Sequence, residues 1–117
     1  MATLVPQVAT KAGIVPTFNT TAVAGDVFAN DGLTYVHFKN GAVAKTVTIV
    51  AATTSTTKPG FGTITLSNQT VTVGENAEKI CAFFEPAIYN NASGQVAMTY
   101  SSETNLTVAV VKTPERI

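Results

Sequence analysis

The sequence is dominated by short runs in which Thr alternates with Val, Ile or Leu. Residues 46–49 (TVTI), 70–73 (TVTV) and 107–110 (TVAV) are examples. Such alternation is typical of a β-strand with one buried face, because successive side chains point to opposite sides of a sheet. No segment keeps a 3.6-residue period over the length of a helix. The chain is therefore expected to fold as β-sheet.

The strand signal is nearly continuous from Asp26, and turn residues interrupt it about every 8–12 positions. The segments with this signal are residues 33–39, 42–51, 62–66, 70–73, 79–84, 95–100 and 105–111. Asn40-Gly41 lies between the first two and predicts a type I′ hairpin turn. Residues 52–61 are predicted to form a Thr/Ser loop. The sequence thus predicts an all-β fold, an antiparallel β-sandwich or small β-barrel of seven to eight short strands.

The first 20 residues differ from the rest. Pro6 and Pro16 stand where a central strand would not tolerate them, and Gly13 adds conformational freedom between them. Residues 1–20 are therefore predicted to be an extended N-terminal arm, which either lies on its own domain or reaches a neighbour. Residues 21–117 are predicted to form the β-sandwich or barrel domain, and 117 residues suffice for one domain with a core.

Charged residues are scarce. They make up 12% of the chain, about half the usual share of roughly 25%, and the formal net charge is zero. The seven Lys and Arg are scattered singly, which argues against nucleic acid or an anionic membrane as a partner. The start of the chain shows no secretory signal pattern, and no apolar run approaches the ~20 residues of a transmembrane helix.

Residues that carry chemistry are almost absent. The single His, His37, stands in a predicted strand, and catalysis would need a carboxylate or nucleophile brought to it by the fold. The single Cys, Cys81, excludes a disulfide within one chain and sits in an apolar run, which favours a buried, unreactive thiol. One Cys and one His do not supply the four ligands of a structural zinc site. We therefore expect no catalytic, cofactor-binding or metal-binding residues, and no enzyme activity.

Other polar motifs have ordinary interpretations. Asp26 and Asp31 flank a short segment that lacks the dense Asp/Asn pattern of a calcium loop, so a solvated turn is the favoured interpretation. Residues 60–62 (GFG) are not followed by the Lys-Ser/Thr pair of a phosphate-binding loop. The remaining acidic residues show no pairing in the sequence; they are Glu75, Glu78, Glu85, Glu103 and Glu115. Glycosylation triplets occur at Asn19, Asn68, Asn91 and Asn105, as expected by chance in a chain rich in Thr and Ser.

Three stretches resemble a known family. They are residues 31–41 (DGLTYVHFKNG), residues 84–91 (FEPAIYNN) with the GQV, TYS and LTVAV segments that follow, and the start TLVPQVATKAG. Together they resemble the head decoration (cement) proteins of tailed bacteriophages. The resemblance covers most of the chain, although its motifs are turns and core strands.

The resemblance implies a β-rich protein on the outer capsid surface of the virion, made in the host cytoplasm. Such a protein often forms a homotrimer at three-fold positions and bridges neighbouring major capsid protein subunits. The family has no catalytic residues to transfer, and residues 1–20 are expected to contact the capsid or another subunit. Two alternatives stay open: a tail, neck or fibre component of the virion, and a carbohydrate-binding β-sandwich module. The absence of Trp weakens the latter, because sugar binding usually uses exposed aromatic rings.

Overall fold

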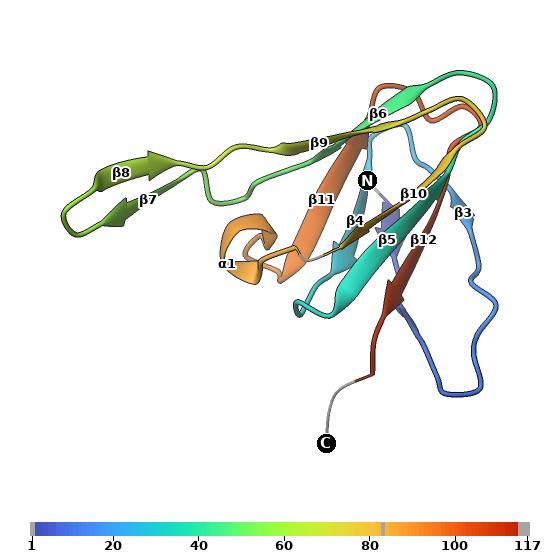
Figure 1. Ribbon diagram of the computed structural model, residues 1–117, viewed down its shortest axis with the longest axis horizontal. Helices are drawn as coiled ribbons and strands as arrows, with labels where there is room; N and C mark the ends of the chain where they lie inside the picture. Colours follow the sequence, from blue (N-terminus) through green and yellow to red (C-terminus); the bar gives the residue numbers. More distant parts are fainter. Residues whose placement is uncertain (1, 83, 115–117) are drawn as a thin grey trace.

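The computed structural model describes residues 2–82 and 84–114, which fold into two β-sheets packed face to face (Figure 1). The strands are β1 (Ala2–Leu4), β2 (Gln7–Val8), β3 (Asn19–Thr20), β4 (Asp26–Ala29), β5 (Thr34–Lys39), β6 (Lys45–Ile49), β7 (Ser55–Lys58), β8 (Gly62–Thr65), β9 (Gln69–Val73), β10 (Glu78–Ala82), β11 (Gln95–Tyr100) and β12 (Thr107–Lys112). One helical turn, α1 (Pro86–Tyr89), precedes β11. A helix with the length and apolarity needed to cross a membrane does not occur in the described residues. The predicted all-β class is confirmed.

The strands are divided between two larger sheets and one hairpin. The first sheet has the order β1-β4-β11-β6-β9, and the second has the order β10-β5-β12-β2, with β3 also pairing with β12. Strands β7 and β8 form a separate two-stranded sheet. Neighbours are antiparallel except β1 with β4 and β2 with β12, which are parallel. Because the two larger sheets keep separate edges, the fold is a sandwich rather than a closed barrel.

The core lies between the two larger sheets. Val47 and Ile49 of β6 are fully buried, whereas Thr46 on the opposite face is exposed, as the alternation predicts. Phe38 of the second sheet meets Tyr100 of the first edge-to-face, with ring centroids 6.5 Å apart. Each fully buried large apolar side chain contributes roughly 1.5–3 kcal/mol. The other strand residues of this core are Leu4, Phe28, Val36, Val73, Val96, Met98, Val108 and Val110.

The predicted hairpin at Asn40-Gly41 is wrong. Strand β5 belongs to the second sheet and β6 to the first, so the connection crosses from one sheet to the other. Neither residue has the positive φ of a type I′ turn. The Asn40 amide instead donates to the carbonyl oxygens of Val73 and Gly74, at 3.0 and 3.1 Å. Gly41 provides space, since a Cβ there would lie 2.8 Å from Cβ of Asn105.

The predicted loop at residues 52–61 is also partly wrong, because residues 55–58 form β7 and pair with β8. Residues 21–114 therefore contain nine strands, β4 to β12, rather than seven to eight. The turn is closed by the Phe61 amide, which donates to the Lys58 carbonyl at 3.0 Å. Pro59 and Gly60, the latter with φ of 82°, occupy the two central positions, as in a type II turn. The hairpin projects well beyond the sandwich (Figure 1).

The described part of the predicted arm, residues 2–20, contributes three short strands to the sandwich. Strand β1 pairs with β4 in the first sheet, and the chain then crosses to the second sheet, where β2 pairs with one end of β12. It returns through a loop to β3, which pairs with the other end of β12. The segment therefore lies on its own domain, and its loop hangs away from the sheets (Figure 1). Met1, Phe83 and residues 115–117 of the predicted segments lie outside the described residues.

Candidate functional site

His37 has the carboxylate partner that the sequence could not locate. Its Nε2 atom lies 2.8 Å from Oε1 of Glu78 on the neighbouring strand β10. On its other side the ring meets Phe18 edge-to-face, with centroids 5.0 Å apart. The Lys39 ammonium lies 4.2 Å from the centroid of the same Phe18 ring. This cluster holds the returning part of the N-terminal segment against the outer face of the second sheet.

Cys81 is half-buried rather than fully buried. Burial raises the pKa of its thiol, and the charge of Lys79 offsets only part of that rise. The side chain packs against the core from β10, the edge strand of the second sheet. Its neighbour Ile80 points outward and is 62% exposed. The thiol therefore lies in an apolar, partly accessible place at one edge of the sandwich.

Asp26 and Asp31 have different surroundings and different partners. Asp26 is fully buried, and its Oδ2 atom accepts hydrogen bonds from the Tyr100 hydroxyl at 2.6 Å and the Ala22 amide at 3.3 Å. Burial and the nearby Asp26 carboxyl raise the pKa of the Tyr100 hydroxyl far above its usual value. Asp31 is exposed and accepts from the Leu33 amide and the Lys112 ammonium, both at 3.0 Å. Within residues 2–82 and 84–114, no three His, Cys, Asp or Glu side chains are grouped as metal ligands would be.

The other polar motifs serve turns or lie on the surface. The Asn68 side chain accepts the Ala51 amide at 2.8 Å, and the Asn91 side chain accepts the Ser93 amide at 2.9 Å. Asn105 adopts a positive φ of 60°, which asparagine tolerates better than most residues. Asn19 lies in β3 and is exposed. Glu75, Glu85 and residues 60–62 (GFG) are exposed, and Glu103 is partly buried. Glu115 lies outside the described residues.

The N-terminal segment presents an apolar surface. We call its three exposed valines the N-terminal surface; they are Val5, Val8 and Val15, with exposures of 77%, 48% and 92%. Single exposed apolar residues are normal, but three between residues 5 and 15 mark a candidate contact region. The sequence alone could not identify these valines as exposed, because valine is also the residue expected at buried positions of a strand.

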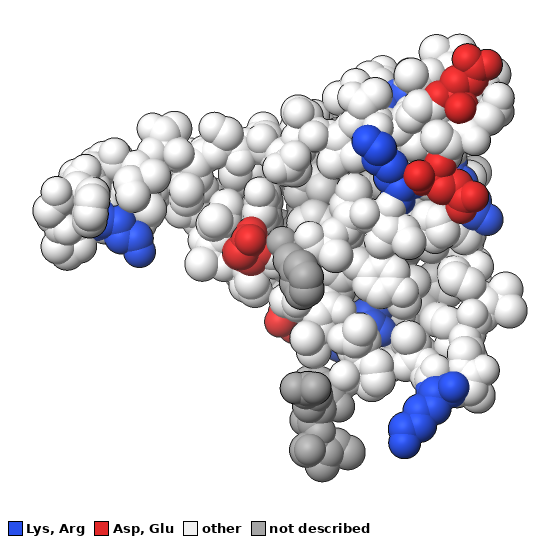
Figure 2. All heavy atoms as spheres, viewed as in Figure 1, with Lys and Arg blue, Asp and Glu red and all other residues white. Residues whose placement is uncertain are grey.

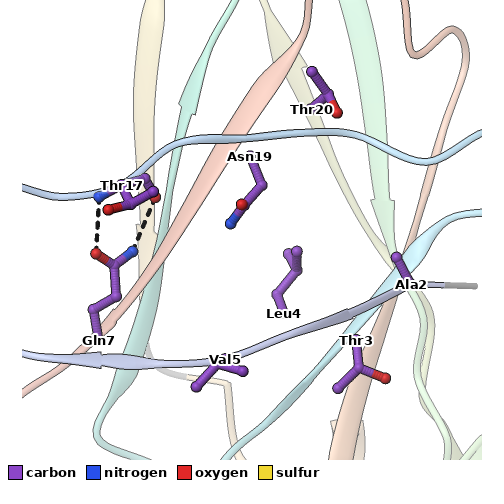
Figure 3. A pocket seen from close by; sticks show the side chains of 8 residues that line it. All are labelled: Ala2, Thr3, Leu4, Val5, Gln7, Thr17, Asn19 and Thr20. Carbon is purple, nitrogen blue, oxygen red and sulfur yellow. Dashed lines mark hydrogen bonds between the residues drawn. The ribbon is translucent and has the colours of Figure 1, made fainter.

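A cavity of about 510 Å³ lies between the outgoing and returning parts of this segment (Figure 3). Leu4 and Asn19 approach the space between the two parts from opposite sides. The Gln7 side chain closes one end, because its amide donates to the Thr17 carbonyl at 2.9 Å and its oxygen accepts the Thr17 amide at 2.8 Å. These two bonds brace the segment as a loop of fixed width.

The edge of β12 behind this cavity is only partly paired with other strands. Strand β2 pairs with Val111 and Lys112, and β3 pairs with Thr107 and Val108. Among the described residues, the stretch between them has no strand partner on this edge. These two residues, Ala109 and Val110, are fully buried, so this edge is covered although no strand pairs with it. The N-terminal segment therefore combines exposed apolar side chains with a cavity.

The β7–β8 hairpin is the second candidate surface. Every residue of β8 is exposed, and in β7 only Thr56 is partly covered. Phe61 at the tip is 83% exposed, and Ile64 is 40% exposed. Lys58 is the only charged residue between Lys45 and Glu75 in the sequence. The hairpin and the N-terminal loop project from different sides of the sandwich (Figure 1).

The surface as a whole carries few charges. Figure 2 shows one face that is mostly uncharged, with several basic and acidic side chains side by side at the upper right and single ones elsewhere. The chain has seven basic and seven acidic residues among 117. With so little charge, recognition through these surfaces must rest on apolar contact and neutral hydrogen bonds. Comparisons of the chain with models of protein families, with curated proteins and with solved structures find no match.

Proposed function

We propose that this protein is a structural component of a tailed-bacteriophage virion that decorates the outer capsid surface and bridges subunits of the major capsid protein. The observation that carries the proposal is the N-terminal surface: exposed valines held on a braced loop, on a molecule with very few charges. The sequence resemblance to decoration proteins supports the same role. The proposal includes a homotrimer, as that resemblance implies, and no catalytic step.

The proposed mechanism is mechanical. Burial of apolar surface contributes about 25 cal/mol per Å², and a protein that binds only the intact shell shifts the equilibrium toward that shell by mass action. The N-terminal surface suits this task because short strands before, within and after it are already paired to the two sheets and the Gln7–Thr17 hydrogen bonds brace the loop that carries Val15. Little conformational entropy is then lost when the valines are buried against a capsid.

The test is binding to expanded capsids of the same phage. Wild-type protein should co-sediment with the capsids and raise the temperature at which they disrupt. Val15→Asp should weaken binding strongly, because it would bury a charge in an apolar contact. Val43→Asp is the matched control, since Val43 is 65% exposed but lies in the β5–β6 connection.

Two results would contradict the proposal. One is a wild-type protein that does not bind the capsids, and the other is equal weakening by the two aspartate variants. Electron microscopy of decorated particles adds a separate readout. Density over the whole shell supports decoration, whereas density at a single vertex would indicate a neck or tail component instead.

A further inference from the structure

A groove opens on the side of the sandwich where β9 and β10 form the two sheet edges. We call it the β9–β10 groove; its volume is about 300 Å³. Ile49 and Phe84 border it but are almost completely buried. Its accessible lining combines half-buried Val71, Cys81 and Tyr89 with the polar side chains of Gln69 and Glu85. The groove therefore offers both apolar and polar contacts.

The groove has a single charged residue, Glu85, at its lining. Glu85 is also the only charged residue between Lys79 and Glu103 in the sequence. Among the described residues it forms no ion pair. A partner that fills this groove should thus carry an apolar group for Val71, Cys81 and Tyr89 and a positive charge for Glu85.

The tip of the β7–β8 hairpin has that chemistry. Phe61 supplies a large exposed ring, and Lys58, three residues earlier, supplies the one charge of the hairpin. Lys58 has no ion-pair partner within the described residues. The rise from residue 53 to the turn at residue 59 is about 20 Å at roughly 3.4 Å per residue. Such a projection is long enough to reach beyond its own sandwich.

The hairpin does not fill the groove of its own chain. Its tip points away from α1 and from the body of the sandwich, whereas Tyr89 of α1 lines the groove (Figure 1). A two-stranded hairpin without a packed face is only marginally stable in water, so it gains most from a partner. The complementary surfaces are therefore present on one chain but separated within it.

We propose that the hairpin tip of one copy of this protein docks in the β9–β10 groove of a second copy. Phe61 enters the groove against Val71, Cys81 and Tyr89, and Lys58 lies next to Glu85 of the neighbour. Each copy then donates one hairpin and accepts another. Such a contact joins two different surfaces, and repetition around a rotation axis closes it into a ring. Its role in the virion rests on the proposed function, since it would hold neighbouring decoration subunits together.

Disulfide trapping tests the contact, because Cys81 is the only cysteine and lines the groove. Thr63→Cys places a second thiol on exposed β8, two residues from Phe61, so the docking ring is kept and folding should not be affected. With copper phenanthroline as oxidant, the two thiols lose two protons and two electrons and join. We expect covalent multimers in which mass spectrometry links position 63 of one chain to Cys81 of another.

Three controls make the result specific. The same variant with Cys81→Ser should lose the link to position 81. Val15→Cys, on the equally exposed N-terminal loop, should not link to Cys81. Lys58→Glu added to Thr63→Cys should lower the rate of linking roughly two- to fivefold, the effect of one exposed ion pair, and Glu85→Lys added to that variant should restore it.

The proposal is overturned if no link between positions 63 and 81 forms, or if Val15→Cys links to Cys81 as fast as Thr63→Cys does. The experiment uses the isolated protein without capsids. Its failure therefore leaves capsid binding through the N-terminal surface untouched. Conversely, if the protein cross-links as expected but does not bind capsids, the proposed function is refuted, whereas the contact between copies is still supported.

Discussion

The N-terminal segment and the β7–β8 hairpin both expose apolar side chains, but only the first is fastened to the sandwich. The N-terminal segment pairs with both sheets, is braced by Gln7, and has Phe18 held between His37 and Lys39. The strands of the hairpin pair only with each other, and their residues are almost all exposed. The difference separates a surface fastened to the core from an element held only by its own strand pairing.

This difference has an energetic consequence. Immobilising a flexible side chain at an interface costs about 0.5–1.5 kcal/mol, and a preformed surface avoids most of that cost. The N-terminal surface should therefore bind as a rigid body. The hairpin contributes little to the stability of a single copy, and it gains stability where a partner covers Phe61. The two regions should respond to substitution in opposite ways.

The largest expected effect compares Leu4→Ala with Phe61→Ala. Leu4 belongs to the N-terminal segment but is buried in the core, so its truncation should lower the free energy of unfolding by about 2–5 kcal/mol. Phe61 is 83% exposed, so its truncation should change this free energy by no more than about 0.5 kcal/mol. Urea denaturation of dilute protein measures both. Equal costs would show that the two regions are equally integrated and would break the comparison.

The sequence was a reliable guide wherever one strand face is buried. Residues 95–100 were predicted as a strand, and β11 has those bounds, with Val96, Met98 and Tyr100 against the core. The alternation is informative there because packing requires it. In β12 it accounts for the burial of Val108 and Val110 but not for that of Ala109 and Val111 on the opposite face.

Local signals failed where tertiary contacts decide the conformation. The Asn40-Gly41 pair has the composition of a tight hairpin turn. Instead, the Asn40 side chain links the β5–β6 connection to the end of β9 by donating hydrogen bonds to the Val73 and Gly74 carbonyls. Strand β7 was missed because neither of its faces packs against the core. Its sequence, STTK, therefore has no apolar residues that could alternate with polar ones. The β1 and β2 pairings involve two or three residues and partners far along the chain, which leaves no local pattern to detect.

The candidate surfaces were even less visible in the sequence. Residues 1–20 were predicted as a contact region, but the cavity between their two parts depends on Gln7 meeting Thr17. The pairing of His37 with Glu78 joins positions 41 residues apart. The groove arises from strands of different sheets, β9 and β10, which only the fold brings to one side.

A smaller effect is expected from Tyr100→Phe, which tests how the N-terminal segment is anchored. The change removes the 2.6 Å hydrogen bond to buried Asp26, whose carboxyl also accepts the Ala22 amide just beyond the segment. A buried acceptor that loses a partner costs about 1–3 kcal/mol. Urea denaturation should show that loss, and hydrogen exchange should show faster exchange in β1 and β3 than in wild type, with no change in β7 and β8.

Tyr35→Phe is the matched control, because Tyr35 is half-buried in β5 and its hydroxyl makes no hydrogen bond among the described residues. It should leave stability nearly unchanged. If both variants are destabilised equally, the Asp26 contact does not anchor the segment. If Tyr100→Phe accelerates exchange in the hairpin as well, the two regions are coupled, and the comparison must be revised.

The smallest expected effect comes from Asp31, whose ion pair with Lys112 lies beside the crossing of the N-terminal segment between the sheets. The segment's Ala9 amide donates to the Lys112 carbonyl at 3.0 Å, which links the pair to that segment. The hydrogen bond from the Leu33 amide, followed by the one from Lys112, lowers the pKa of Asp31 below its usual 3.8. A lowered pKa means that the ionised carboxylate is favoured in the folded state. Its contribution is therefore complete above the unfolded pKa and is lost as the pH falls through the folded one.

Asp31→Asn isolates this contribution. Because the carboxylate is exposed and screened by solvent, the variant should lose at most about 0.5 kcal/mol at neutral pH. The difference from wild type should be constant above about pH 5 and should shrink as the pH falls below about 4. Denaturation across this range measures it, and added salt should reduce the part due to Lys112. A difference that grows on acidification would mean that Asp31 destabilises the fold when charged, and the fastening of the N-terminal segment would then rest on its strand pairing and on Phe18 alone.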